Sequence, residues 1–187
     1  MRYIYFLFGT VVIVFGIYTA GIYLDLYGEL EEPGYSINSE LPKSLVNQKL
    51  ISQEPFGREK QILFGDTHVH TTYSTDAFLW SLPILNGEGP HPIADACDFA
   101  RFCANLDFWV STDHAEALTP RKWNSIKEAV RNCNSPTDAN DPDLVTFLGY
   151  EWTQVGNTAE THYGHKNVMF LDIEEGKVPE RAIGAGG

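Results

Sequence analysis

Positive charge is scarce in this sequence. Among 187 residues, 13 are Lys or Arg and 25 are Asp or Glu, so the formal net charge is −12 and the pI is about 4.8. An acidic surface repels phosphate backbones, and we therefore expect no general nucleic-acid binder. A small phosphorylated substrate is not excluded, because a bound metal ion dominates the charge of its own site. The apolar fraction of 43% is typical of a globular domain with a core.

Cysteine is also scarce, and its spacing limits the possible disulfides. The three cysteines are Cys97, Cys103 and Cys133. Cys97 and Cys103 lie six residues apart on a predicted helix, an axial rise of about 9 Å, which is too far for a bridge. Any disulfide must therefore use Cys133. We predict Cys103–Cys133, since both would lie at C-terminal ends of helices that follow parallel strands; the alternative is three buried thiols.

Charged side chains are absent from residues 3–24. Arg2 precedes this run, and Asp25, Glu29, Glu31 and Glu32 follow it. Its length favours a transmembrane anchor over residues 1–24 in the inner membrane, with the N-terminus cytoplasmic and the remaining chain periplasmic or extracellular. A cleaved signal peptide, which would give a secreted protein, and a buried core helix are the alternatives.

No internal repeat is visible, but the composition changes along the chain. Residues 25–60 contain Pro33, Pro42 and Pro55 with scattered charge, which predicts a linker with one short helix near Leu41–Leu50. Residues 61–187 are predicted to form the globular domain.

Strands and helices alternate in the predicted domain. We expect strands at 62–66, 106–112, 144–150 and 166–172, and helices at 93–105 and from Thr119-Pro120 toward Cys133. In the first helix, the spacing of Ala96, Phe99, Ala100 and Cys103 predicts the buried face. This β-α-β-α-β order predicts parallel strands joined by right-handed crossovers.

Residues that bind metals follow the predicted strands. The clusters are His68-Val-His70 with Asp76, Asp113-His114, Glu151, and His162-Tyr-Gly-His165. In an extended chain, residues i and i+2 point to one face, so His68 and His70 can reach the same ion. Carboxyl ends of parallel strands meet at one edge of a barrel, which is where active sites form. His165 is preferred over His162 because it adjoins the fourth predicted strand.

The donor types indicate two catalytic carboxylates and a transition-metal site. A mixed His/carboxylate set suits Zn, Mn or Fe. Glu151 has two oxygens and can bridge two ions, which can together activate a water molecule. Asp113 is expected either to orient a ligating histidine or to hold a turn. The predicted metal ligands are His68, His70, Asp76, His114, Glu151 and His165.

These motifs resemble the polymerase and histidinol phosphatase (PHP) superfamily. Residues 64–74, Phe-Gly-Asp-Thr-His-Val-His-Thr-Thr-Tyr-Ser, are similar to its first motif, 111–114 to its second and 149–151 to its third. The strings Asp-His-Ala-Glu-Ala-Leu-Thr-Pro at 113–120 and Gly-Tyr-Glu-Trp-Thr at 149–153 resemble the branch called domain of unknown function 3604.

The resemblance implies a fold, an activity and a cofactor. The fold would be a distorted (β/α)7 barrel with two or three divalent metal ions, and the activity phosphoester hydrolysis of a small substrate. His68 and His70 would bind the first ion, His114 the second and His165 the third, with Glu151 bridging. Relatives carry further ligands on later strands, which nothing after His165 supplies, so we expect the chain to be the N-terminal part of such a domain.

Three functions remain open from the sequence. An exported, membrane-tethered phosphoesterase is favoured. Metal-assisted hydrolysis of a non-phosphate ester or an amide uses the same ligands. A truncated or degenerate module that binds metal without turnover is the alternative from a different class.

Overall fold

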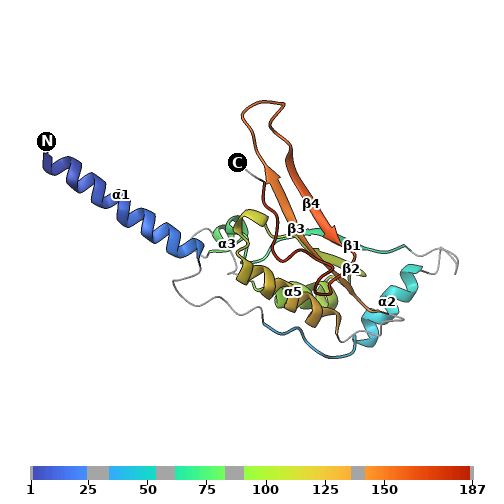
Figure 1. Ribbon diagram of the computed structural model, residues 1–187. Coiled ribbons are helices and arrows are strands. Elements are labelled where there is room, and N and C mark those ends of the chain that lie inside the picture. The colour runs from blue at the N-terminus through green and yellow to red at the C-terminus, as the bar shows by residue number, and fades with distance from the viewer. Residues whose placement is uncertain (1, 25–33, 54–61, 83–90, 136–141, 186–187) are drawn as a thin grey trace. The chain divides into compact units, whose positions relative to one another are not determined.

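The computed structural model of this protein describes residues 2–24, 34–53, 62–82, 91–135 and 142–185 (Figure 1). The chain divides into two compact units, Met1–Glu31 and Glu32–Gly187. The ends of the predicted linker, residues 25–33 and 54–60, lie outside the described residues.

The first unit contains a single described helix, α1 (Arg2–Tyr23). Across the described residues, no helix combines the length and the apolar character that a membrane crossing requires. The predicted transmembrane helix is therefore not supported. The prediction rested on the length of the uncharged run and on the charges that flank it, and the run also contains glycine, threonine and tyrosine residues.

The second unit is a mixed α/β fold built on a curled, four-stranded half-barrel sheet. Its strands are β1 (Gly65–Val69), β2 (Phe108–Ser111), β3 (Val145–Gln154) and β4 (Gly164–Phe170), in the order β1-β2-β3-β4. The first three strands are parallel, as the alternation of strands and helices predicts. The closed (β/α)7 barrel that the resemblance implied is not confirmed.

The fourth strand departs from the predicted parallel arrangement. β4 runs antiparallel to β3, and Figure 1 shows the two side by side as a long hairpin. β3 continues to Gln154, beyond its predicted end, and only residues 155–163 connect it to β4. A parallel return needs a crossover of a dozen or more residues, so this short connection imposes the hairpin.

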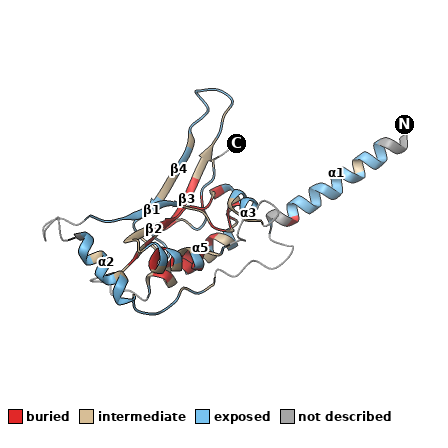
Figure 2. Ribbon diagram, turned by 180° about the vertical axis from the view of Figure 1, so that it is seen from behind, coloured by how far each residue is buried: buried red, intermediate tan, exposed pale blue. Residues whose placement is uncertain are grey.

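Helices precede and connect the parallel strands. They are α2 (Lys43–Gln53), α3 (Thr75–Ser81), α4 (Ile93–Asp98), a π-helix (Phe99–Cys103), a 3₁₀ turn (Ala115–Ala117) and α5 (Pro120–Asn134). The Thr119 side chain caps α5 by accepting a hydrogen bond from the Lys122 amide. Trp123, Ile126 and Val130 of α5 are fully buried, and α5 packs against β3, where Figure 2 shows the buried residues concentrated.

The segment after residue 92 buries a different face from the predicted one. Ile93, Ala94, Cys97 and Ala100 are buried, whereas Phe99 and Cys103 are exposed. The buried residues still follow helical spacing, but the stripe starts at Ile93 rather than at Ala96. The π-helix at the end of this segment has a wider turn than an α-helix, which the predicted α-helical spacing did not anticipate.

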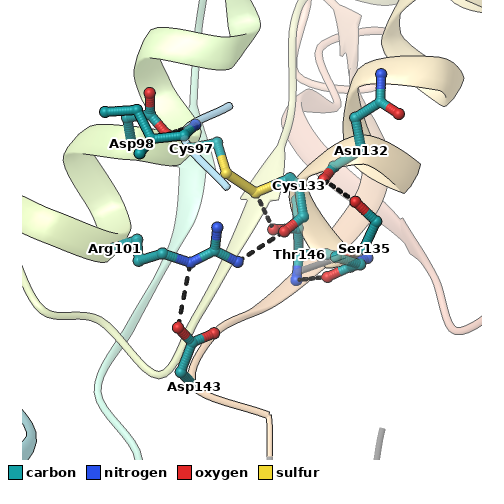
Figure 3. The surroundings of a disulfide bond; sticks show 10 residues. Cys97, Asp98, Arg101, Asn132, Cys133, Ser135, Asp143 and Thr146 are labelled. Atoms are coloured by element: carbon teal, nitrogen blue, oxygen red, sulfur yellow. Dashed lines mark hydrogen bonds and ion pairs between the residues drawn. A yellow bond between two sulfur atoms is a disulfide. The ribbon is translucent and has the colours of Figure 1, made fainter. Parts of the chain in front are cut away.

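This shift of face also changes the disulfide. The bond joins Cys97 to Cys133, with a Cα–Cα distance of 6.1 Å, and Cys103 is a free, exposed thiol. The predicted Cys103–Cys133 pair is therefore wrong, whereas the participation of Cys133 is confirmed. Figure 3 shows the buried Arg101 beside the bridge, where its Nη2 donates to the Cys133 carbonyl at 2.7 Å and its Nε lies 3.4 Å from Asp143.

Part of the predicted linker packs on the second unit. Lys49 of α2 donates to the carbonyls of Leu106 and Asp143, at 2.8 and 2.6 Å. It also lies 3.1 Å from the Asp107 carboxylate. The Ile37 amide donates to Asp98 at 2.8 Å. Residues 34–53 thus contact the domain rather than only connecting to it.

Candidate metal centre

The first two histidines leave β1 on the same face, as their i, i+2 spacing predicts. His68 lies in the strand and His70 directly follows it. Their rings stack with centroids 4.8 Å apart and planes 6° apart. β1 pairs in parallel with β2, and the His70 ring lies 4.7 Å from that of His114, which follows β2.

Glu151 is the centre of the cluster. It lies in β3, is only 1% exposed, and pairs through the backbone with His114, which follows β2. Its Oε2 atom lies 2.9 Å from His70 Nε2, 3.4 Å from His114 Nδ1 and 3.5 Å from His68 Nε2. Its Oε1 atom contacts His165 Nδ1. Four imidazoles therefore surround one buried carboxylate.

Asp76 contacts the opposite nitrogens of the two inner histidines. It lies in the first turn of α3, 3.5 Å from His70 Nδ1 and 3.1 Å from His114 Nε2. Partial burial acts to raise the pKa of Asp76, but hydrogen bonds from the Ala77 amide and His114 outweigh it, so this pKa lies below its usual value. The carboxylate stays ionised beside the two rings.

Asp113 holds the loop that follows β1. It is fully buried and accepts hydrogen bonds from the Thr71 amide at 2.7 Å, the Thr71 hydroxyl at 2.9 Å and the Ser74 hydroxyl at 2.9 Å. Ser74 Oγ in turn accepts from the His114 amide at 2.9 Å. Burial raises the pKa of Asp113, and the three hydrogen bonds act against that rise. Of the two expected roles, these contacts favour holding a turn.

β4 supplies the remaining residues through cross-strand pairing. His165 lies opposite Thr153, and Asn167 lies opposite Glu151. Thr153 Oγ1 is 3.1 Å from His165 Nδ1 and 3.2 Å from His114 Nδ1. Asn167 Nδ2 donates to the Thr67 carbonyl at 2.7 Å and lies 3.1 Å from His68 Nδ1, so this amide contacts the side of the His68 ring opposite Glu151.

Thr153 and Asn167 were missed by the sequence reasoning. The signal that could have found them is the alternation of the strand, since Thr153 is two residues after Glu151 and Asn167 two after His165. The competing His162 is exposed and lies 3.3 Å from the Gly156 carbonyl. His165 rather than His162 therefore belongs to the described cluster.

The donor atoms fit divalent metal ions. Three groups of donors each lie within 4.8 Å of one another: His68/His70/Glu151, His70/Asp76/His114 and His114/Glu151/His165. Ligands bound to one ion at ~2.0–2.3 Å lie roughly 3–4.5 Å apart, which matches these separations. His70 Nε2 is buried and close to Glu151, yet it makes no hydrogen bond to any described residue. A buried imidazole nitrogen that faces a carboxylate without a hydrogen bond fits the donor of a metal ion.

The family model described as "Protein of unknown function (DUF3604)" matches residues 57–121. This match supports the DUF3604 family. Neither the curated proteins nor the solved structures gave a match.

The DUF3604 match covers part of the cluster. His68, His70, Asp76, Asp113 and His114 lie within it, whereas Glu151 and His165 lie beyond it. The structure brings the two parts together through the pairing of β2 with β3 and of β3 with β4. Membership of the wider PHP superfamily stays a prediction from the motifs.

Proposed function

We propose that this protein is an exported hydrolase that uses two divalent metal ions, and that its reaction is phosphoester hydrolysis. The observation that carries the proposal is the buried Glu151 carboxylate among four imidazole nitrogens, which come from the ends of β1 and β2 and from the hairpin strand β4. A carboxylate with this surrounding is typical of a bridging metal ligand rather than of a structural ion pair.

The chemistry of imidazole limits the number of ions. A neutral imidazole offers one nitrogen to a metal and keeps a proton on the other. His70 and His114 each belong to two of the three donor groups, so the three groups cannot all be filled at once. Two ions use each histidine of the cluster once. One ion would bind His68, His70 and Glu151, and the other would bind His114, Glu151 and His165.

In this assignment Asp76 orients ligands instead of binding an ion. It faces His70 Nδ1 and His114 Nε2, the two nitrogens that would carry protons. An ionised carboxylate on these N–H groups fixes the tautomer and makes the opposite nitrogens more basic. The low pKa of Asp76 supports this role.

The ions, once bound, would supply Lewis-acid activation of a water molecule and stabilise the charge that develops on the substrate. The chain's own residues contribute position. Glu151 would hold both ions through its two oxygens. Hydrogen bonds of Asp113 and Ser74 hold the loop between His70 and Asp76 against the residues that follow β2. The resemblance to PHP motifs favours phosphorus as the reacting centre.

The test begins with metal content. The purified full chain is dialysed against Zn²⁺, Mn²⁺ or Fe²⁺, and bound metal is measured by mass spectrometry. We expect two ions per chain, and fewer than one in Glu151→Gln. The matched control is Glu128→Gln, which removes an exposed carboxylate of α5 outside the cluster and should retain two ions.

Turnover then separates the remaining functions. Metal-loaded protein is assayed with p-nitrophenyl phosphate, bis-p-nitrophenyl phosphate and p-nitrophenyl acetate. Hydrolysis of either phosphate ester supports the proposal, and hydrolysis of the acetate alone supports the non-phosphate alternative. Two bound ions without turnover of any ester would instead support a metal-binding module.

The proposed location rests on the disulfide. Disulfides form and persist in oxidising compartments, and the Cys97–Cys133 bond joins two elements of the domain core. We therefore place Glu32–Gly187 outside the cytoplasm. External protease added to intact spheroplasts should cleave the domain; full protection until lysis would reject this placement.

A further inference from the structure

A second feature of the domain is a cavity of about 930 Å³ beside the metal cluster. It is bounded by β1, by Trp109 of β2, and by α4 with the π-helix that follows. This volume lies within the range of small-molecule sites. Every lining residue belongs to the described part of the second unit.

The cavity shares a wall with the cluster. His68 and His70, which face Glu151, also line the cavity. A molecule that fills it therefore has one end next to the donors of the first proposed ion. The remaining wall is largely apolar and includes Val69, Phe99, Phe102 and Leu106. Phe99 is 64% exposed, which is unusual for a Phe on a helix next to a core.

The Asp side chains of the lining are not matched by Lys or Arg among the residues that the structure describes. Asp66, Asp95 and Asp98 line the cavity, together with His91, whose Nδ1 lies 3.3 Å from the Asp95 carboxylate. Asp95 and Asp98 lie on α4, an element that contributes no donor to the metal cluster. An anionic ligand body would be repelled here, whereas an ammonium group on an apolar body gains both burial and charge attraction.

We infer that this cavity binds the body of the substrate, and that this body is an apolar group carrying a positive charge, such as an arylalkyl amine. The identification of the ligand as substrate rests on the proposed function. The class of ligand rests on the cavity alone. The hydrolysable group would lie at the His68/His70 end and the ammonium group toward α4.

Cys103 provides a direct reporter of occupancy. It lines the cavity, is exposed, and is the one cysteine outside the disulfide. The full chain is treated with iodoacetamide under non-reducing conditions, and Cys103 alkylation is followed by mass spectrometry. The probes are 1-naphthylmethylamine, which is cationic, and 1-naphthoate, which is anionic and of similar size.

We expect the amine to slow alkylation saturably, and the carboxylate to require at least about tenfold higher concentration. Asp95→Asn should weaken protection by the amine about two- to fivefold, since an exposed carboxylate contributes modestly. Glu128→Gln is the control and should leave protection unchanged. Ala96→Phe narrows the cavity and should weaken protection further, with circular dichroism confirming that the variant folds.

Three results would overturn the inference: equal protection by both probes, protection by the amine that Asp95→Asn does not weaken, or a Cys103 that resists alkylation without any probe. The last result would mean that protein already covers the cavity. The proposed function is tested separately by turnover of p-nitrophenyl phosphate, which the amine should inhibit competitively. Turnover without amine binding would reject this inference alone, and amine binding without turnover would reject the proposed function alone.

Discussion

At the residue scale, the cluster could be predicted where it depends on local geometry. His68 and His70 share a face because they are two residues apart in extended chain. Asp113-His114 follows β2, and Glu151 lies in β3, which pairs in parallel with β2. Thr153 and Asn167 depend instead on the register of a hairpin. Nothing in the sequence near Asn167 indicates that it lies opposite Glu151.

The first prediction concerns Asp113. In Asp113→Asn, an amide NH₂ replaces one acceptor oxygen, so at least one buried donor among the Thr71 amide, the Thr71 hydroxyl and the Ser74 hydroxyl loses its partner. We expect a loss of about 1–3 kcal/mol of stability. Differential scanning calorimetry should show a Tm lower by about 3–10 °C.

The control for Asp113 is Asp172→Asn, which removes an exposed carboxylate that contacts Lys177 and should leave the Tm unchanged. If Asp113→Asn were as stable as the wild type but lost turnover, the loop-holding role would be wrong. The catalytic role predicted from the sequence would then be favoured.

At the element scale, the three parallel strands, the presence of a fourth strand and α5 could be predicted, but the direction of β4 and the buried face of α4 could not. Hydrophobic runs in the sequence locate the strands, and the Thr119-Pro120 cap locates the start of α5. Strand direction depends on the length and conformation of the connection, which a run of apolar residues does not report. The buried stripe of this segment starts at Ile93, and the segment ends in a π-helix. The residues at 99–103 contain no pattern that predicts this wider turn.

The second prediction concerns Gly149, in the centre of β3. A Cβ atom there would lie 2.6 Å from the Val168 carbonyl oxygen and 3.0 Å from the Ser111 carbonyl oxygen. Because both neighbours are backbone atoms, Gly149→Ala must displace β2 or β4. We expect about 1–3 kcal/mol of destabilisation by urea unfolding, together with weaker metal binding. Gly9→Ala in α1, where nothing lies within 4 Å, should show neither effect.

The third prediction concerns the disulfide. Cys97→Ser removes the disulfide, whose two cysteines are 36 residues apart in the sequence. The loop-entropy relation predicts that the free energy of unfolding falls by about 4 kcal/mol. Reducing agent should lower the Tm of the wild type to a similar degree and leave Cys97→Ser unaffected. Cys103→Ser should retain the wild-type Tm, since Cys103 is free and exposed. A non-reducing peptide map that joins Cys103 to Cys133 would contradict the pairing.

At the scale of the whole molecule, the described site belongs to one unit. Every donor of the metal cluster, both disulfide cysteines and the buried residues of α5 and β3 lie within Glu32–Gly187. From composition, the sequence predicted boundaries after residues 24 and 60, since charge and proline appear after residue 24. It did not predict that residues 34–53 pack on the domain through Ile37 and Lys49.

The last prediction follows from this division. A chain that starts at Glu32 retains Ile37, Lys49 and all six predicted metal ligands, so it should fold, form the Cys97–Cys133 bond and bind two divalent ions. Bound metal, a non-reducing peptide map and thermal unfolding should agree with those of the full chain in the same buffer. A second truncation that starts at Gln61 removes the contacts of Ile37 and Lys49 and should be less stable, with the same cluster. If the Glu32 chain instead lost metal, a residue of the first unit would have to take part in the site, and the assignment of both ions to the second unit would be wrong.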